Sequence, residues 1–271
     1  MDKRPIGVFD SGLGGLTAVR ELRRLLPGED IVYFGDTGRV PYGGRSAETI
    51  IKYARQDVAF LRTFDLKAIV IACGTVSTTA LDVLAAENPI PVLGVVAPAA
   101  AAAARSTKNG AIGLIGTQAS IRSGAYERLI RAENPAARVL ARPCPLFVPL
   151  VEDGRFRPGD VVIETVAEEY LAPLKQAGVD TLVLGCTHYP LLIDVIRACM
   201  GPGVTLINAG AEGAKAAAAA LAAADALNDR QAGGRYRYFV SDRQEDFSRL
   251  ASIFLGWDVT EAVGQVDIAA F

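Results

Sequence analysis

The sequence has no excess of basic residues. Its 271 residues include 28 Lys and Arg and 30 Asp and Glu, which gives a formal net charge of −2 at pH 7. A protein that binds a phosphate backbone needs a basic surplus or a basic stripe to neutralise it. We therefore expect no nucleic acid partner.

Long apolar runs are also missing. The alanine-rich runs at residues 97–104 and 214–224 are interrupted by Pro98 and Lys215. Both runs are too short or too weakly apolar to span a bilayer. Residues 1–5 lead directly into an expected strand rather than into the apolar core of a signal peptide. We expect no membrane segment and a cytoplasmic location.

Cysteine and histidine are scarce, with 4 and 1 residues respectively. No two cysteines form a C-x-x-C pair, so neither a zinc site nor a thioredoxin-like site is indicated. Cys144, which lies between two prolines, and Cys199, late in a helical pattern, are interpreted as small buried apolar residues. Cys73 and Cys186 differ from these two, because each directly follows an apolar run that is expected to form a strand.

Short β-type runs alternate with helical patterns, which is typical of βαβ units and a mainly parallel sheet. The length allows one large domain or two of ordinary size. The expected strands are residues 6–9, 31–34, 67–72, 92–96, 111–115, 139–142, 181–185, 205–207 and 236–240. The expected helices are residues 16–26, 47–63, 78–87, 120–132, 161–176, 191–200 and 212–227.

Elements of the first half recur in the same order in the second half, which indicates duplication of one α/β unit. We predict two similar open α/β domains with mainly parallel sheets, related by a pseudo-twofold axis, with the active site in the cleft between them. The first domain would comprise residues 1–97 and 209–271, and the second residues 98–208.

The tail is expected to complete the first domain. Ser241 and Asp242 would cap an amphipathic helix that ends near Leu255. Residues 257–263 would form a final strand.

Two of the expected strands end at a thiol. Cys73 follows the apolar residues 69–72, and Cys186 follows residues 182–185. Ligands of open α/β folds bind at the carboxyl ends of parallel strands. Two thiols in equivalent positions of two half-molecules would face one ligand from opposite sides. This arrangement suits an acid/base pair that acts on both faces of one carbon.

The glycine-rich turn after the first strand, residues 10–15, offers backbone N–H groups and a helix N-terminus to an anion. A dinucleotide fingerprint needs a third glycine where Thr17 stands, so NAD is disfavoured. Asp10 has two interpretations, as a helix cap and as a functional carboxylate.

Other loops also carry polar groups. Gly43 and Gly44, after Tyr42, would present backbone donors to a carboxylate or form an ordinary turn. Thr75 would bind a ligand or cap the following helix. Glu152 would orient a nearby imidazole or be a solvated loop acid.

His188 is the single histidine of the chain and lies two residues after Cys186. A lone histidine is more often structural than catalytic, but its position beside a thiol at a ligand-binding edge favours function. A Cys-His nucleophile that forms an acyl enzyme is an alternative, although it leaves Cys73 without a role. Pyridoxal phosphate is disfavoured, because neither cysteine turn contains a lysine.

Six strings extend over almost the whole chain: residues 7–17 (GVFDSGLGGLT), 41–43 (PYG), 72–73 (AC), 147–152 (FVPLVE), 185–190 (GCTHYP) and 239–242 (FVSD). Together they resemble the glutamate racemases of the aspartate/glutamate racemase family, which need no cofactor. The paired cysteine motifs are specific, whereas each other string alone is weak.

The resemblance implies racemisation of glutamate between two domains, which supplies D-glutamate for peptidoglycan synthesis. It implies that Cys73 deprotonates D-glutamate and Cys186 deprotonates L-glutamate. Asp10 and His188 would assist their respective thiols, and Glu152 would be an acid near the second. The positions that match substrate contacts are Asp10, Ser11, Tyr42, Gly43, Gly74, Thr75, Thr117, Ser120, Thr187 and His188. Neither a metal nor a cofactor is implied, and a homodimer is expected.

The chain departs from the family pattern at three positions. Gly74 follows the first cysteine where the family usually carries Asn, and one lost amide hydrogen bond would cost about 0.5–1.5 kcal/mol. Ser120 replaces the usual Thr, and Asn208 lies near a commonly acidic position. Two alternatives therefore stay open: a racemase for aspartate or another small amino acid, and a protein that binds an amino acid without converting it.

Overall fold

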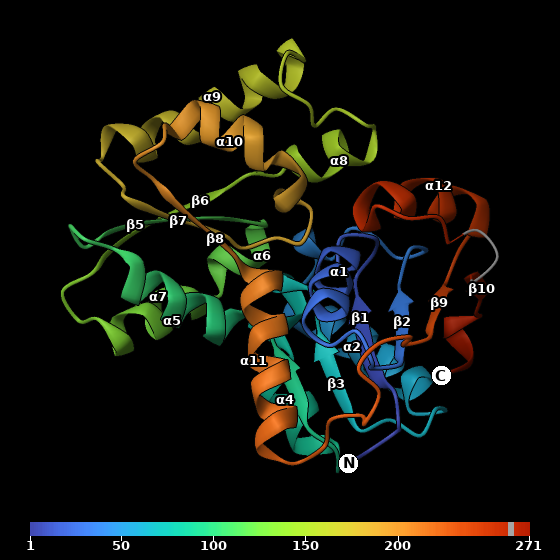
Figure 1. Ribbon diagram of the computed structural model, residues 1–271. Helices are drawn as coiled ribbons and strands as arrows, with labels where there is room; N and C mark the ends of the chain where they lie inside the picture. Colours follow the sequence, from blue (N-terminus) through green and yellow to red (C-terminus); the bar gives the residue numbers. More distant parts are fainter. Residues whose placement is uncertain (260–262) are drawn as a thin grey trace.

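The computed structural model describes residues 1–259 and 263–271, and its strands form two parallel sheets (Figure 1). The strands are β1 (Ile6–Asp10), β2 (Ile31–Gly35), β3 (Ala68–Ile71), β4 (Val92–Gly94), β5 (Ala111–Gly116), β6 (Arg138–Pro143), β7 (Thr181–Leu184), β8 (Thr205–Asn208), β9 (Tyr236–Val240) and β10 (Val263–Gln265). One sheet has the order β10-β9-β2-β1-β3-β4, and the other has the order β6-β5-β7-β8. The predicted α/β class with parallel sheets is confirmed.

The two sheets share one strand order. The run β2-β1-β3-β4 in the first sheet corresponds to β6-β5-β7-β8 in the second, as expected from the repeated order of elements in the sequence. Strands β9 and β10 extend the first sheet beyond β2, in parallel register. This pairing supports the proposal that the tail completes the first domain. The exact domain bounds stay a prediction.

Helices cover both faces of each sheet (Figure 1). They are α1 (Leu16–Leu25), α2 (Ala47–Leu61), α3 (Gly74–Thr79), α4 (Leu81–Glu87), α5 (Val96–Ser106), α6 (Gln118–Arg122), α7 (Ala125–Glu133), α8 (Phe147–Glu152), α9 (Val161–Gln176), α10 (Ile193–Met200), α11 (Ala209–Ala223) and α12 (Gln244–Leu255). Short 3-10 turns are η1 (Tyr42–Gly44), η2 (Tyr189–Leu192) and η4 (Ile268–Ala270).

The alternation of side chains along β1 explains the layers of the first half. Ile6 and Val8 join the core that contains residues of α1 and α12, whereas Phe9 points to the opposite face and packs with α2. In the second half, α9 and α10 lie on one face of the sheet and α5 and α7 on the other (Figure 1). Because both faces are covered, the strand ends are where a ligand can reach the sheets.

Several expected elements differ in their bounds. The helix expected at residues 78–87 is two helices, α3 and α4, which meet at Ala80. The helix expected at residues 120–132 is also divided, because Gly124 adopts a left-handed conformation with φ +62° between α6 and α7. The strand expected at residues 92–96 ends at Gly94, and α5 begins at Val96. Helix α8 was not predicted.

The tail also differs in detail. The N-cap of α12 is Arg243, which makes no side-chain cap, so the expected cap at Ser241 and Asp242 is wrong. Ser241 instead donates from its hydroxyl to Asp36. Of the expected final strand, residues 257–259 are not in a strand, Val263 is the first residue that β10 is described with, and residues 260–262 lie outside the described residues.

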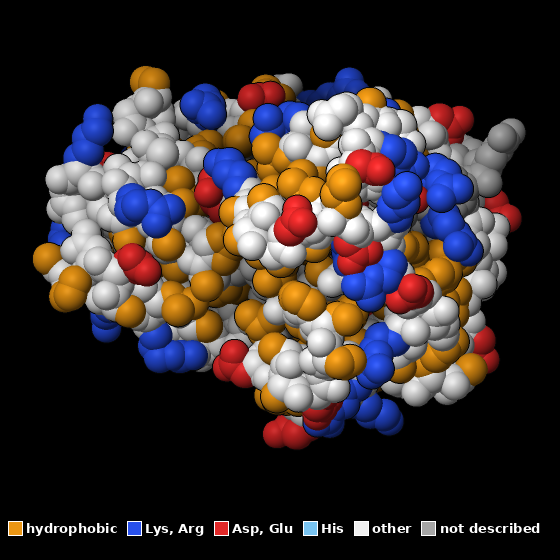
Figure 2. All heavy atoms as spheres, turned by 60° about the horizontal axis from the view of Figure 1, so that its bottom comes forward, with side chains coloured by type: hydrophobic (Ala, Val, Ile, Leu, Met, Phe, Trp, Pro, Cys, Tyr) orange, Lys and Arg blue, Asp and Glu red, His pale blue; other side chains and the backbone are white. Residues whose placement is uncertain are grey.

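Charged side chains of both signs occur across the face shown in Figure 2, without one continuous basic stripe. Among the helices that the structure describes, none has the length and apolar character needed to cross a bilayer.

Candidate active site

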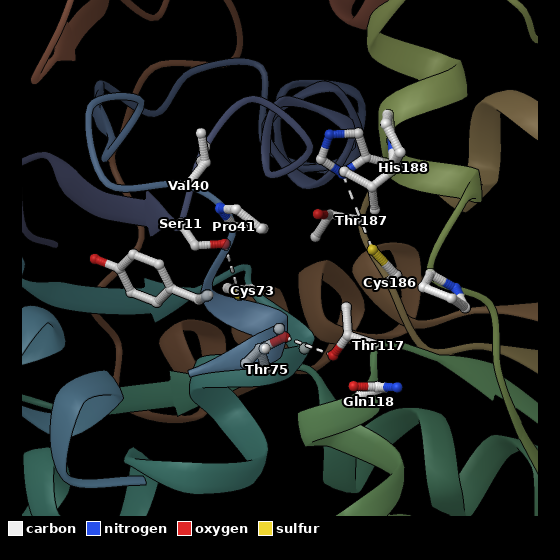
Figure 3. Close-up of a pocket in the computed structure, with 18 of the residues that line it drawn as sticks. Ser11, Val40, Pro41, Cys73, Thr75, Thr117, Gln118, Cys186, Thr187 and His188 are labelled. Atoms are coloured by element: carbon white, nitrogen blue, oxygen red, sulfur yellow. Dashed lines mark hydrogen bonds between the residues drawn. The ribbon is translucent and has the colours of Figure 1, made fainter. Parts of the chain in front are cut away.

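A cavity of about 360 Å³ lies where the strand ends of the two sheets meet (Figure 3). Its volume is within the usual range for small-ligand sites. It is lined by Ser11, Gly12, Val40, Pro41, Tyr42, Gly43, Gly44, Cys73, Gly74, Thr75, Thr117, Gln118, Cys144, Pro145, Val148, Pro149, Glu152, Cys186, Thr187 and His188.

Cys73 forms one wall of the cavity, at the point where β3 ends and α3 begins. Its Sγ lies 3.2 Å from Ser11 Oγ. The side chain is buried, and burial together with the nearby Asp10 carboxylate raises the pKa of the Cys73 thiol to about 12. The protonated thiol is therefore the resting form.

Cys186 forms the opposite wall, after the end of β7 (Figure 3). Its Sγ lies 3.9 Å from His188 Nδ1, and His188 Nε2 lies 2.9 Å from Glu152 Oε1. Burial opposes protonation of the imidazole, but its hydrogen bonds with Cys186 and Glu152 outweigh burial and raise the pKa of His188 to about 10. At neutral pH the imidazole is therefore a cation, and it lies beside the sulfur of Cys186.

Asp10 lies behind the cavity rather than on its surface. The backbone N–H of Gly12 donates to Oδ2 at 3.1 Å, and Thr187 Oγ1 donates to Oδ1 at 3.4 Å. Burial raises the pKa of Asp10 above its ordinary value. The carboxyl thus connects the first glycine-rich turn to the second cysteine turn.

Hydroxyl groups also link the two halves at the base of the cavity. The Oγ1 atoms of Thr75 and Thr117 lie 2.9 Å apart, and Thr117 Oγ1 donates to Ser120 Oγ at 3.1 Å. Thr17 Oγ1 donates to the carbonyl oxygen of Thr187 at 3.1 Å. Thr75 follows β3 of the first sheet and Thr117 follows β5 of the second, so their contact connects the strand ends of the two sheets.

The structure brings most predicted residues into one place. The cavity is lined by eleven of them, namely Ser11, Tyr42, Gly43, Cys73, Gly74, Thr75, Thr117, Glu152, Cys186, Thr187 and His188. Asp10 and Ser120 are buried behind this lining. The phenol of Tyr42 is bonded to the buried carboxylate of Asp36, so the hydroxyl is already engaged.

Other lining residues were missed. Cys144 is buried, as expected, but it also lines the cavity, directly after β6. The rule that ligands bind at strand ends would have found it. Val148 and Pro149 come from the short helix α8, and Val40 and Pro41 from the loop after β2. Their apolar side chains indicate no chemistry by themselves, although Pro41, Val148 and Pro149 belong to the strings that carry the family resemblance.

The described residues hold no cluster of three or more His, Cys, Asp or Glu side chains that could bind a metal ion. The parts of the cavity lining that the structure describes include no lysine to form a Schiff base. Their functional groups are thiols, hydroxyls, one amide, one imidazole and one carboxyl. Two thiols on opposite walls of one cavity are an arrangement that can transfer protons at two faces of a bound carbon acid.

Comparison with known proteins agrees with this class of site. The sequence profile of the Asp/Glu/Hydantoin racemase family matches residues 15–230, and the chain belongs to this family. A glutamate racemase from Geobacter metallireducens is 45% identical over 270 residues, which cover 100% of this chain and 99% of that protein.

Solved structures of glutamate racemases share the fold. One from Bacillus anthracis has a TM-score of 0.93 and 38% identity, with 98% of each chain covered. One from Francisella tularensis in complex with D-glutamate has a TM-score of 0.92 and 37% identity, with 100% of each chain covered.

Proposed function

We propose that the protein interconverts L-glutamate and D-glutamate without a cofactor, by two-base proton transfer between Cys73 and Cys186. The observation that carries the proposal is the position of these thiols on opposite walls of one cavity (Figure 3). A single base would tend to return the proton to its original face. The glutamate racemases at 45% and 37% identity support the choice of substrate.

The protonated state of the Cys73 thiol assigns a direction to the resting enzyme. Cys186, beside the His188 cation, would remove the α-proton of L-glutamate, while the Cys73 thiol donates a proton to the opposite face. The products are D-glutamate, a Cys186 thiol and a Cys73 thiolate. The reverse reaction starts from this second state, and the net proton count is unchanged.

The carbanion that forms at Cα needs donors around the α-carboxylate, where negative charge develops. We propose that the hydroxyls of Ser11, Thr75, Thr117 and Thr187 and the backbone of Gly43 supply them, because all line the cavity. Both thiols are little exposed, and the water that a bound substrate displaces from the cavity would strengthen these contacts.

Circular dichroism of L- or D-glutamate, incubated with metal-free and cofactor-free protein, tests the proposal. We expect the signal of either enantiomer to decay to zero with the wild-type protein. Cys73→Ala and Cys186→Ala should each abolish this decay, whereas Cys199→Ala should not. Wild-type turnover by either of the first two variants would refute the two-thiol scheme.

Aspartate is the second candidate substrate because of Gly74. This residue lines the cavity but lacks the side-chain amide that the family usually carries there and that could contact glutamate. Turnover of both enantiomers of aspartate and glutamate should show a preference for glutamate. Solvent deuterium incorporation at Cα distinguishes a racemase from a protein that only binds amino acids, because a binder incorporates none.

We also propose that the protein supplies D-glutamate for peptidoglycan synthesis, acts in the cytoplasm and forms a homodimer. The family membership supports the first proposal. A strain that lacks the protein should require external D-glutamate for growth. Cell fractionation tests the location, and sedimentation velocity tests the dimer.

A further inference from the structure

A buried polar cluster anchors the loop at residues 40–44, which forms one wall of the cavity. Asp36 lies directly after β2 and Asp57 lies on α2, and both are 0% exposed. Arg39 joins them: its Nε donates to Asp36 Oδ2 at 2.6 Å and its Nη2 donates to Asp57 Oδ1 at 2.9 Å. The Tyr42 side chain lies within the same cluster.

The single hydroxyl of Tyr42 contacts oxygens of two carboxyl groups. Its hydroxyl is bonded to Asp36 Oδ2 and also lies 3.2 Å from Asp57 Oδ2. A phenol has one proton, so it cannot donate to two carboxylates at once. Without a further proton, the second contact would place two buried oxygens with only lone pairs against each other, which is unfavourable. One of the two carboxyl groups must therefore supply a proton.

The surroundings of the two carboxyl groups decide which one carries it. Asp36 accepts hydrogen bonds from Arg39 and from Ser241 Oγ, the latter at 2.7 Å. Asp57 Oδ2 has only the Tyr42 hydroxyl as a partner among the described residues. Besides Tyr42, Asp36 thus has two donors that stabilise a carboxylate, whereas Asp57 has only Arg39, on its other oxygen.

Electrostatics agrees with this assignment. Burial, then the neighbouring Asp36 carboxylate, raises the pKa of Asp57 well above its ordinary value, and Asp10 acts in the same direction. Arg39 and a hydrogen bond with the Tyr42 hydroxyl act in the opposite direction. The single guanidinium faces two carboxyl groups and is itself partly exposed, and the one phenol proton is directed at Asp36.

We propose that Asp57 is a protonated positioning residue: its Oδ2 donates to the oxygen of Tyr42, and Tyr42 donates to Asp36. The relay fixes η1 and holds Gly43 at the cavity. The functional consequence rests on the proposed substrate binding at this loop, whereas the proton on Asp57 does not.

Infrared difference spectroscopy tests the proton directly. At neutral pH we expect a carboxylic acid C=O band in the wild-type protein that is missing in Asp57→Asn. Asp65→Asn, which changes an exposed acid of the first half, should leave the band unchanged. A spectrum in which Asp57→Asn removes no such band would overturn the proposal, whether or not the protein racemises glutamate.

Kinetics tests the positioning. In Asp57→Asn the amide can donate to Tyr42 and accept from Arg39, so KM should stay within about threefold of wild type. Asp57→Leu offers no donor, and KM should rise about tenfold with a smaller change in kcat. Equal KM values for the two variants would contradict a positioning role.

The pH dependence provides a second readout. As the pH rises through the raised pKa of Asp57, the wild-type protein loses the proton and KM should increase. Asp57→Asn has no proton to lose at this position, so this increase should be absent. The same increase in Asp57→Asn would show that another group is responsible and would overturn the proposal.

Discussion

At the scale of single residues, the contacts of each thiol decide its role. Cys73 faces a neutral hydroxyl and a buried carboxyl, whereas Cys186 faces an imidazole that is bonded to Glu152. The first environment favours the thiol, and the second places a cation beside the sulfur. The asymmetry therefore comes from neighbours of the cysteines, since both occupy equivalent strand ends.

His188 should make folding stability depend on pH. Its pKa is raised from 6.5 to about 10 in the folded state. The stabilisation by the imidazolium is therefore complete below about pH 6.5 and is lost as the pH rises toward 10. Relative to His188→Gln, the free energy of unfolding of the wild-type protein should fall by a few kcal/mol across this interval. Urea unfolding of both proteins at several pH values measures it, and a constant difference would contradict the assignment.

Glu152→Gln should lower kcat/KM about tenfold, because His188 loses a charged hydrogen-bond partner at 2.9 Å. The factor must be the same for both enantiomers, since the equilibrium constant between them is one. Circular dichroism gives both rates. Asp153→Asn, at the exposed neighbouring acid, serves as the control and should keep wild-type kcat/KM. Equal losses in the two variants would mean that the carboxylate of Glu152 has no specific role.

At the scale of helices and strands, the apolar runs predict the first eight strands with small errors at their ends. The strand-end rule then finds Cys73 and Cys186, because it depends only on local pattern. Asp57 could not be found in this way. It lies on an amphipathic helix, and its burial follows from a loop that folds over it. Helix α8 was missed because six residues with an internal proline carry little helical signal.

The buried side chain of Lys67 shows how one residue fixes several elements. Its Nζ lies 2.5 Å from Glu29 Oε2 and donates to the carbonyl oxygens of Asp2 and Ala226 at 2.9 and 2.8 Å. These contacts connect the residue before β3 with the start of the chain, the loop before β2 and the segment after α11.

Lys67→Met should destabilise the protein by about 3–5 kcal/mol, because it leaves the buried carboxylate of Glu29 without its cation. Lys3→Met removes an exposed ion pair with Asp229 and should cost less than about 1 kcal/mol. Urea denaturation of the two variants makes the comparison. Similar losses of unfolding free energy in the two variants would show that the buried ion pair stabilises the protein no more than the exposed one.

At the scale of the whole molecule, glycines let the two halves approach closely around the cavity. An added Cβ at Gly14 would overlap Thr187, and one at Gly43 would lie 2.8 Å from Thr117 Cβ. At Gly74 it would overlap the carbonyl oxygen of Gly185, which is backbone and cannot rotate away. Gly74 therefore sets how closely the two cysteine-bearing strand ends can meet.

Gly74→Ala should force the halves apart by about 1 Å, and a misplacement of this size lowers kcat/KM by about 100-fold. Gly116→Ala is the matched control, since its Cβ would meet no atom closer than 3.4 Å. Steady-state kinetics and a crystal structure of each variant test the expectation. Wild-type kcat/KM in Gly74→Ala would show that the two halves accommodate a Cβ at this position without a change in the site.

In the proposed reaction, protons move through two different groups on opposite faces of one carbon. Racemisation of L-glutamate in deuterated water, followed to low conversion, distinguishes this route from a reaction with a single base. We predict that the D-glutamate formed carries deuterium at Cα while the remaining L-glutamate keeps its proton. D-glutamate that retains the original proton would mean that one group both removes and returns it, and would contradict the account.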